Sequence, residues 1–176
     1  LYRVTAFVAL QAGLSLDVKD ETAIAALADN LVEQLQLRFE GDVIMLNDED
    51  VSDAIRSEAG GRHASQVSVL PLVRQALLKL QHSFRTLPGL VADGRDMGTV
   101  IFPNAPLKVF LTATAEKRAV RRYKQLISKG FSAILDNLRA DLEARDERDS
   151  SRNVAPLKPA QDAKLLDNSA LSIEES

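Results

Sequence analysis

The stretch GLVADGRDMGTVIFPNAPLKVFL, residues 89–111, decides how this chain folds, because it joins two short apolar runs through a charged loop. The runs at 90–92 and 107–111 have the length of buried strands, and a third such run occupies 163–167. Helical patterns lie before residue 90 and between residues 111 and 163. Apolar strands separated by helices indicate a parallel sheet, so we predict an α/β protein. In such sheets ligands bind beyond the carboxyl ends of the strands, which is where residues 93–98 would lie.

Apolar periodicity predicts further elements around these strands. The helical segments are 1–13, 20–31, 52–66, 71–80, 114–130 and 132–152. The residues expected to begin or end these helices are Gly13, Asp20, Pro71, Thr114, Gly130 and Ser132. The helix at 52–66 is expected to break at Gly60-Gly61, and Ser172–Glu175 has the spacing of a capping box. Alternating apolar residues over 35–46, with a turn at Gly41-Asp42, predict a β-hairpin.

The composition narrows the class of protein. A chain of 176 residues is long enough for one core with inserted lobes. Its net charge of −3 gives no bulk attraction to nucleic acid, so any anion site must be built locally from clustered arginines. The absence of cysteine excludes a disulfide framework and a thiolate metal site. We find no apolar stretch of membrane-spanning length and no signal-peptide pattern, so we expect a soluble cytoplasmic protein without a membrane partner.

The loop at 93–98 carries groups suited to an anionic ligand. Gly94 and Gly98 would let the backbone bend and a ligand approach closely. Arg95 offers a rigid fork of donors that matches phosphate oxygens, whereas Asp96 can only accept hydrogen bonds. Asp93, at the predicted strand end, could hold part of a Mg²⁺ shell. The alternative is that Arg95 simply pairs with Asp93 or Asp96, and the spacing alone does not separate the two.

Two further groups of arginines stand on predicted helices. One comprises Arg118, Arg121 and Arg122, which share a helix face. The other comprises Arg145, Arg148 and Arg152, with Asp149 on the same side. Taken alone, each group is more simply explained as a solvated face with ion pairs to Glu143, Asp146 and Glu147. Two arginine faces together with the charged loop instead favour a polyphosphate ligand.

The sequence resembles the bacterial cytidylate kinases. The resemblance is carried by residues 89–122 and by ARDERDSSRNVAPLKPAQDAKLLDNSALSIEE at 144–175, and it extends over essentially the whole chain. It implies a monomeric enzyme that transfers the γ-phosphoryl group of ATP to CMP or dCMP with Mg²⁺. It also implies a P-loop kinase-type parallel sheet with helices on both faces, a mobile lid and an enlarged monophosphate-binding lobe that contains the hairpin. The implied segments are 1–16 (core helix), 17–70 (monophosphate lobe), 71–113 (core), 114–160 (lid) and 161–176 (core strand and the start of a last helix).

The same resemblance implies roles for individual residues. Those matching the family's CMP-phosphate arginines are Arg3 and Arg95, and those matching its cytosine-recognising group are Ser65, Arg74 and Asp96. The residues on the ribose side are Arg145, Asp149 and Arg152, while Arg118, Arg121 and Arg122 lie on the lid helix and would act on the transferring phosphates. Asp93 is the implied metal ligand. The segment EAGGRHAS at 58–65 is one residue longer than the family pattern, and Ser65 has the alternative interpretation of an ordinary helix-start hydroxyl.

One departure concerns the ATP site. The loop G-x-x-x-x-G-K-[ST] holds ATP phosphates through backbone amides and a lysine, yet none of the eight glycines here is followed by lysine. We therefore expect the sequence to begin after this loop and to stop within its last helix, leaving strands 90–92 and 107–111 without close pairing. The alternatives to a kinase acting on CMP are a monophosphate-binding or regulatory module without phosphoryl transfer, and a kinase for another pyrimidine monophosphate such as UMP.

Overall fold

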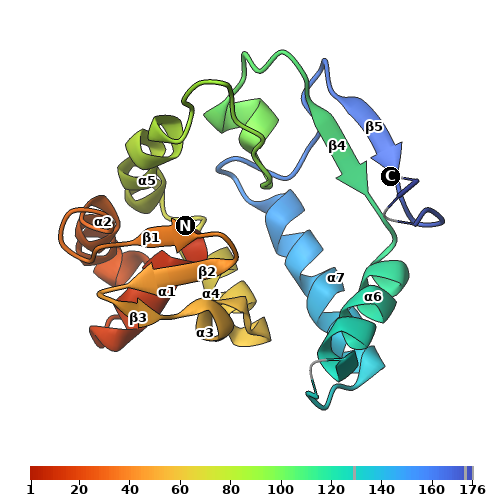
Figure 1. Ribbon diagram of the computed structural model, residues 1–176, viewed down its shortest axis with the longest axis horizontal. Helices are drawn as coiled ribbons and strands as arrows, with labels where there is room; N and C mark the ends of the chain where they lie inside the picture. The colour runs from red at the N-terminus through yellow and green to blue at the C-terminus, as the bar shows by residue number, and fades with distance from the viewer. Residues whose placement is uncertain (129, 173, 176) are drawn as a thin grey trace. The chain divides into compact units, whose positions relative to one another are not determined.

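The computed structural model describes residues 1–128, 130–172 and 174–175. The chain divides into two compact units, Leu1–Val91 and Ala92–Ser176, each of which is described by itself. Helices, an antiparallel three-stranded sheet and a parallel two-stranded sheet are all present (Figure 1). The predicted α/β class, with parallel strands and an antiparallel hairpin, is confirmed.

Helices build most of unit 1. They are α1 (Tyr2–Gln11), η1 (Val18–Asp20), α2 (Glu21–Asp29), α3 (Ser52–Arg56), α4 (Glu58–Val67) and α5 (Pro71–Ser83). α1 packs against α4, and α2 packs against α5. The fully buried side chains at these contacts include Val4, Ile24, Leu31, Val67 and Leu77. As predicted, α1 stops before Gly13, whose φ of +73° favours glycine, and α5 begins at Pro71.

The predicted hairpin forms one side of unit 1. Strands β1 (Arg38–Glu40) and β2 (Val43–Leu46) pair antiparallel with Phe39 opposite Ile44, and Gly41 at φ +61° makes the turn. A third strand, β3 (Glu49–Asp50), pairs with β2 and was not predicted. Its two residues are too few to show an alternating pattern.

Unit 2 contains η2 (Met97–Ile101), β4 (Val109–Thr112), α6 (Ala115–Ser128), α7 (Leu135–Ser151) and β5 (Lys164–Asp167). β4 and β5 are parallel, with Val109 opposite Lys164, and α6 lies beside α7 (Figure 1). The predicted cap at Thr114 is present, because its Oγ1 accepts a hydrogen bond from the Lys117 N–H at 3.2 Å. The predicted capping box is also formed, since Ser172 N–H donates to Glu175 and Glu175 N–H donates to the Ser172 hydroxyl; Ile173 between them lies outside the described residues.

The strand predicted at 90–92 is not formed. A strand satisfies its N–H and C=O groups through a neighbouring strand, and residues 90–92 form no such ladder with any described strand. β4 pairs with β5, and residues 90–92 belong to neither of the two described sheets. The two strands that do form are not buried as predicted, because Leu111 is 58% exposed and Leu165 71% exposed.

Three predictions about helix ends differ in detail from the structure. The break in segment 52–66 falls at Ser57, whose side chain accepts from the Gly60 N–H, and the two glycines lie inside α4. Asp20 is the N-cap residue of α2 as predicted, but its side chain makes no capping bond, because its carboxylate accepts from the Ser15 N–H and hydroxyl, each at 2.7 Å. Ser132 does not cap α7, which begins three residues later with Ile134 at its N-cap.

Candidate functional site

The charged loop leads directly into a π-helical turn. The Ile101 N–H donates to the Asp96 carbonyl at 3.2 Å and the Phe102 N–H to the Met97 carbonyl at 2.7 Å, and this five-residue spacing defines η2. The Asp96 carbonyl also accepts from the Val100 N–H at 2.9 Å. Such turns occur mostly as single turns and often at functional sites. Asp93 and Arg95 are exposed, whereas Asp96 is buried. A Cβ on Gly94 would lie 2.8 Å from Cε of Met97, so the flexible Met97 side chain would have to shift to admit one.

Four of the predicted site residues meet around one carboxylate. Asp149 on α7 is buried, and its Oδ2 accepts from Nε of Arg95 at 3.0 Å. Nε of Arg145 lies 3.7 Å from the same oxygen, and Nη1 of Arg152 lies 3.8 Å from Oδ1. We call these four residues the Asp149 cluster. Three guanidinium groups around one carboxylate leave an excess of positive charge, which suits a phosphate.

The Asp149 cluster shows which carboxylate Arg95 pairs with. The simple alternative paired Arg95 with Asp93 or Asp96, yet among the described residues its partner is Asp149, 54 positions along the chain. Arg95 therefore does form an ion pair, but the pair ties the loop to α7 instead of closing the loop on itself. The contact uses Nε, and the side chain is 40% exposed.

The arginines on α6 do not gather on one group among the described residues. Arg118 forms a bidentate pair with Asp146 on α7 and also donates to the Ala113 carbonyl at 3.1 Å. Arg121 donates to Asn168 and to the Leu171 carbonyl, while Arg122 donates to Gln125 at 3.2 Å. The Arg118 pair joins two helices, so the expected pairing within one helix does not describe it. That pairing does occur between Arg139 and Glu143 on α7.

In unit 1, Ser65 and Arg74 are connected through Ser68. Both predicted residues are buried, and Nη1 of Arg74 donates to the Ser68 carbonyl at 3.1 Å. The Ser68 hydroxyl in turn donates to the Ser65 carbonyl at 3.0 Å. Ser65 lies inside α4, so it is not a helix-start hydroxyl. The guanidinium carbon of Arg74 is 5.8 Å from the centroid of the Tyr2 ring, a cation–π contact that the sequence analysis missed.

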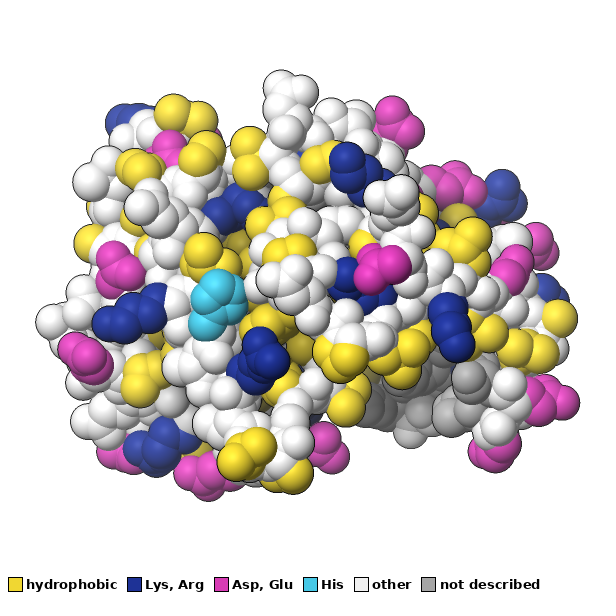
Figure 2. Space-filling view, turned by 90° about the horizontal axis from the view of Figure 1, so that it is seen from above, with side chains coloured by type: hydrophobic (Ala, Val, Ile, Leu, Met, Phe, Trp, Pro, Cys, Tyr) yellow, Lys and Arg dark blue, Asp and Glu magenta, His cyan; other side chains and the backbone are white. Residues whose placement is uncertain are grey.

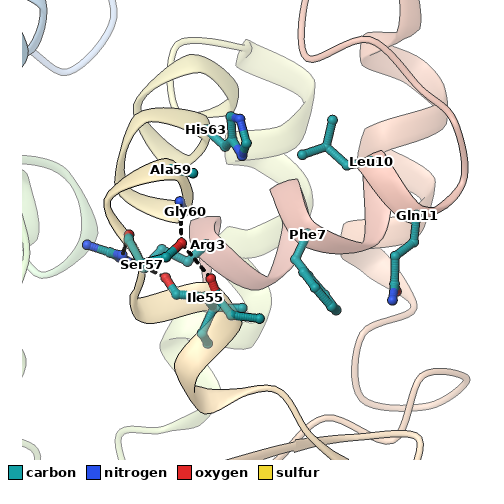
Figure 3. A pocket seen from close by; sticks show the side chains of 10 residues that line it. Arg3, Phe7, Leu10, Gln11, Ile55, Ser57, Ala59, Gly60 and His63 are labelled. Atoms are coloured by element: carbon teal, nitrogen blue, oxygen red, sulfur yellow. Dashed lines mark hydrogen bonds between the residues drawn. The ribbon is translucent and has the colours of Figure 1, made fainter. Parts of the chain in front are cut away.

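Arg3 lies at the edge of a cavity between α1, α3 and α4 (Figure 3). Its Nη1 donates to the carbonyls of Ile55 at 2.6 Å and Ser57 at 3.1 Å, at the junction of α3 and α4. The cavity has a volume of about 380 Å³ and is lined mostly by apolar side chains, with His63 facing Leu10 across it. Gly60 permits this junction, because a Cβ on it would lie 2.5 Å from the Ile55 carbonyl oxygen.

The wider surface carries charges of both signs. Figure 2 shows Lys and Arg side chains interspersed with Asp and Glu on the visible face, in keeping with the net charge of −3. Attraction of an anion therefore depends on local groups such as the Asp149 cluster. No described helix is both long and apolar enough to cross a membrane.

Asp93 is the predicted metal ligand, and its side chain is exposed. Within the described ranges, no group of three or more His, Asp or Glu side chains could hold an ion. Mg²⁺ commonly takes only one or two protein carboxylates and keeps several waters, so the exposed Asp93 carboxylate fits that kind of site. Its role as a ligand stays a prediction.

Comparisons with known proteins agree over the whole chain. A family model described as cytidylate kinase matches residues 1–176. A cytidylate kinase of Cupriavidus necator is 56% identical over 176 residues, which cover 100% of this chain and 77% of the relative. A cytidylate kinase of Pasteurella multocida is 56% identical over 99% of this chain and 76% of the relative. One of Stutzerimonas stutzeri is 55% identical over the same shares of the two sequences.

Proposed function

Because this chain belongs to the cytidylate kinase family, we propose that it serves the transfer of the γ-phosphoryl group of ATP to CMP or dCMP, giving CDP or dCDP. The observation that carries this assignment is the Asp149 cluster, where three arginines surround one buried carboxylate. In phosphoryl transfer the protein mainly positions the phosphates and neutralises their charge, and arginines do both.

Arg95 is the residue best placed to bind the nucleotide phosphate. Its Nε is engaged by Asp149, which fixes the plane of the guanidinium group, and the partly exposed side chain can direct its two terminal nitrogens at two phosphate oxygens. Arg3 is a second phosphate-binding residue in this proposal. Arg145, Asp149 and Arg152 serve the ribose side. Arg118, Arg121 and Arg122 supply positive charge from the lid segment 114–160.

Cytosine is recognised, in this proposal, by Ser65, Arg74 and Asp96 from the monophosphate lobe and the loop. The Asp96 carboxylate can accept a hydrogen bond from the cytosine 4-amino group, whereas uracil presents a carbonyl oxygen there. Two acceptors facing each other in a buried site cost about 1–3 kcal/mol, which would favour CMP over UMP. Mg²⁺, held by Asp93, would neutralise charge on the ATP phosphates. We expect the enzyme to act as a cytoplasmic monomer on free nucleotides.

A second candidate function is binding of the monophosphate without phosphoryl transfer. It is favoured by one observation, which is that no glycine in these 176 residues is followed by lysine. The lysine of the G-x-x-x-x-G-K-[ST] loop contacts the β- and γ-phosphates of ATP. The two functions differ in their products, so they can be separated by experiment.

The test combines binding with turnover. CMP binding to the full chain is measured by titration calorimetry, and formation of CDP from CMP, ATP and Mg²⁺ is followed by chromatography. Arg95→Lys should weaken CMP binding by about tenfold or more, because an ammonium group cannot reproduce the bidentate fork. Arg139→Lys is the matched control, since Arg139 is an exposed residue of α7 that pairs only with Glu143 among the described residues.

Each outcome has a clear reading. CMP binding together with CDP formation supports the kinase, and CMP binding without CDP supports the second candidate. If the chain does not bind CMP, or if Arg95→Lys and Arg139→Lys have equal effects, the proposal is wrong.

A further inference from the structure

Lys108 is a charged residue whose side chain is almost entirely buried. It immediately precedes β4, and the side chain is only 8% exposed. Its Nζ donates to both carboxylate oxygens of Asp162, at 2.9 and 2.8 Å, and Asp162 is 64% exposed. The Lys164 N–H donates to the Lys108 carbonyl at 2.9 Å, so the ion pair stands at the amino-terminal end of the parallel strand pair. A lysine normally leaves its ammonium group in water, so its placement here needs a reason.

The methylene stem of Lys108 lies against the turn that follows Asp96. A Cβ built on Gly98 would lie 3.1 Å from Cδ of Lys108 and 3.3 Å from its Cγ. Gly98 is the second residue of η2, whose hydrogen bonds converge on the Asp96 carbonyl. The backbone of η2 therefore rests directly on the lysine stem, with no side chain between them.

The ion pair with Asp162 explains how a flexible lysine side chain can support the backbone of η2. A free lysine side chain has many rotamers, and fixing one costs up to about 2 kcal/mol of conformational entropy. Two hydrogen bonds to a single carboxylate hold the ammonium group at one point, so the four methylene groups stretch between that point and the backbone of β4. An anchored stem of this kind is a fixed surface, and η2 can adopt only the path that this surface allows.

We propose that Lys108 is a positioning residue for the nucleotide site. Anchored by Asp162, its stem fixes η2 and thereby the buried carboxylate of Asp96, which sets the preference for cytosine over uracil. The effect on the choice of base rests on the proposed function, in which Asp96 contacts the base. The positioning of η2 by Lys108 does not depend on that function.

The test uses two substitutions that separate the stem from the charge. Lys108→Ala removes both, whereas Lys108→Met keeps most of the stem and removes the charge. Lys124→Ala, at an exposed lysine of α6, controls for the loss of a positive charge in the same unit. Circular dichroism first establishes that each variant keeps its helices, and Lys108→Met remains informative if Lys108→Ala does not fold.

Hydrogen exchange tests the positioning of η2 without any nucleotide. The amides of Val100 and Ile101 are the donors to Asp96, so their exchange reports opening of this turn. Lys108→Ala should speed their exchange by about tenfold or more, while Lys108→Met, which keeps the stem but loses its Asp162 anchor, should speed it by a smaller factor of about three. Unchanged exchange in Lys108→Ala, or equal acceleration in Lys124→Ala, would overturn the proposal.

The ratio of UMP to CMP dissociation constants tests the effect on base choice. Lys108→Ala should lower this ratio by about tenfold, mainly through weaker CMP binding, and Lys108→Met should lower it by only about threefold, because its stem is present but not anchored. If the affinities for CMP and UMP fell by the same factor, Lys108 would have only a general structural role, and its proposed effect on base selectivity would be wrong. If the unchanged chain binds neither nucleotide, both the proposed function and the role of Lys108 in base selectivity are wrong. Hydrogen exchange alone then decides whether Lys108 positions η2.

Discussion

Replacing Asp149 with asparagine should lower the free energy of unfolding by about 3 kcal/mol, because it removes the negative charge that faces the buried Arg152 guanidinium group. The Asp149 side chain is 4% exposed and that of Arg152 is 5% exposed. Asparagine has nearly the same shape, so the change removes the charge and leaves the packing in place. Breaking a buried pair by removing one partner costs about 3–5 kcal/mol, and the lower end applies here because Arg95, at 40% exposure, can turn toward water.

The contacts in the Asp149 cluster also predict which arginine contributes most. Arg95 is nearer than Arg152, at 3.0 Å against 3.8 Å, so distance alone favours Arg95 by a factor of about 1.3. Water around the more exposed Arg95 raises the effective dielectric constant, and the range from about 20 near a protein to about 80 in water is a factor of about four. The weakening of the Arg95 interaction by water is therefore larger than the gain from its shorter distance to Asp149. Arg152 should therefore couple more strongly to Asp149 than Arg95 does.

Double-mutant cycles in urea measure this difference. The single variants are Asp149→Asn, Arg152→Met and Arg95→Met, and unfolding is followed by circular dichroism at 222 nm. We expect a coupling energy of about 2 kcal/mol for the pair with Arg152 and below about 1 kcal/mol for the pair with Arg95. Equal couplings, or a larger one for Arg95, would refute the argument that burial outweighs distance in this cluster.

Two other predictions concern unit 1. Gly60→Ala should destabilise the chain by about 1–3 kcal/mol, since the new Cβ would lie 2.5 Å from the Ile55 carbonyl oxygen, although alanine normally gains up to about 1 kcal/mol over glycine inside a helix. Thermal unfolding decides the sign, and a stabilised variant would contradict the close approach of α3 and α4. Hydrogen bonds from the Ser15 hydroxyl and N–H lower the pKa of Asp20, so the folded state binds a proton less readily than the unfolded state. The stability that Asp20 supplies is then present above its unfolded pKa of about 4 and lost as the pH falls through the lower folded value. The difference in melting temperature between Asp20→Asn and the unchanged chain should accordingly shrink on acidification, and a constant difference would show that the Ser15 contacts do not set it.

Local rules predicted the elements whose ends depend on their own residues. The hairpin about Gly41, the end of α1 before Gly13, the start of α5 at Pro71 and the cap at Thr114 all follow from the backbone preference or hydrogen-bonding capacity of one residue. Elements that depend on a distant neighbour were less predictable. The run at 90–92 is apolar enough for a strand, but a strand also needs a partner, and no local pattern reveals whether one exists.

The charged motifs and the family resemblance proposed residues for the candidate site, but they did not predict how these residues pair. Arg95 has acids on both sides at Asp93 and Asp96, and proximity in sequence made these its natural partners. The partner on α7 is favoured over Asp93 because Asp149 is buried, and a buried charge needs a counterion far more than an exposed one does. The exposed Asp93 can remain hydrated at little cost, so it offers Arg95 a weaker interaction.

The pairing of α7 with two separate arginines has a consequence for how the candidate site moves. Asp146 holds Arg118 of α6, and Asp149, one turn later on the same helix, holds Arg95 of the loop. Residues three apart on a helix are separated by about 4.5 Å along its axis and share a face, so the two carboxylates move as one body. A displacement of α6 that keeps the Arg118 pair intact therefore carries Asp149 with it and must either move the loop or break the contact with Arg95. Arg95, the proposed phosphate-binding residue, and α6 are in this way coupled through two carboxylates of α7, with no direct contact between them required.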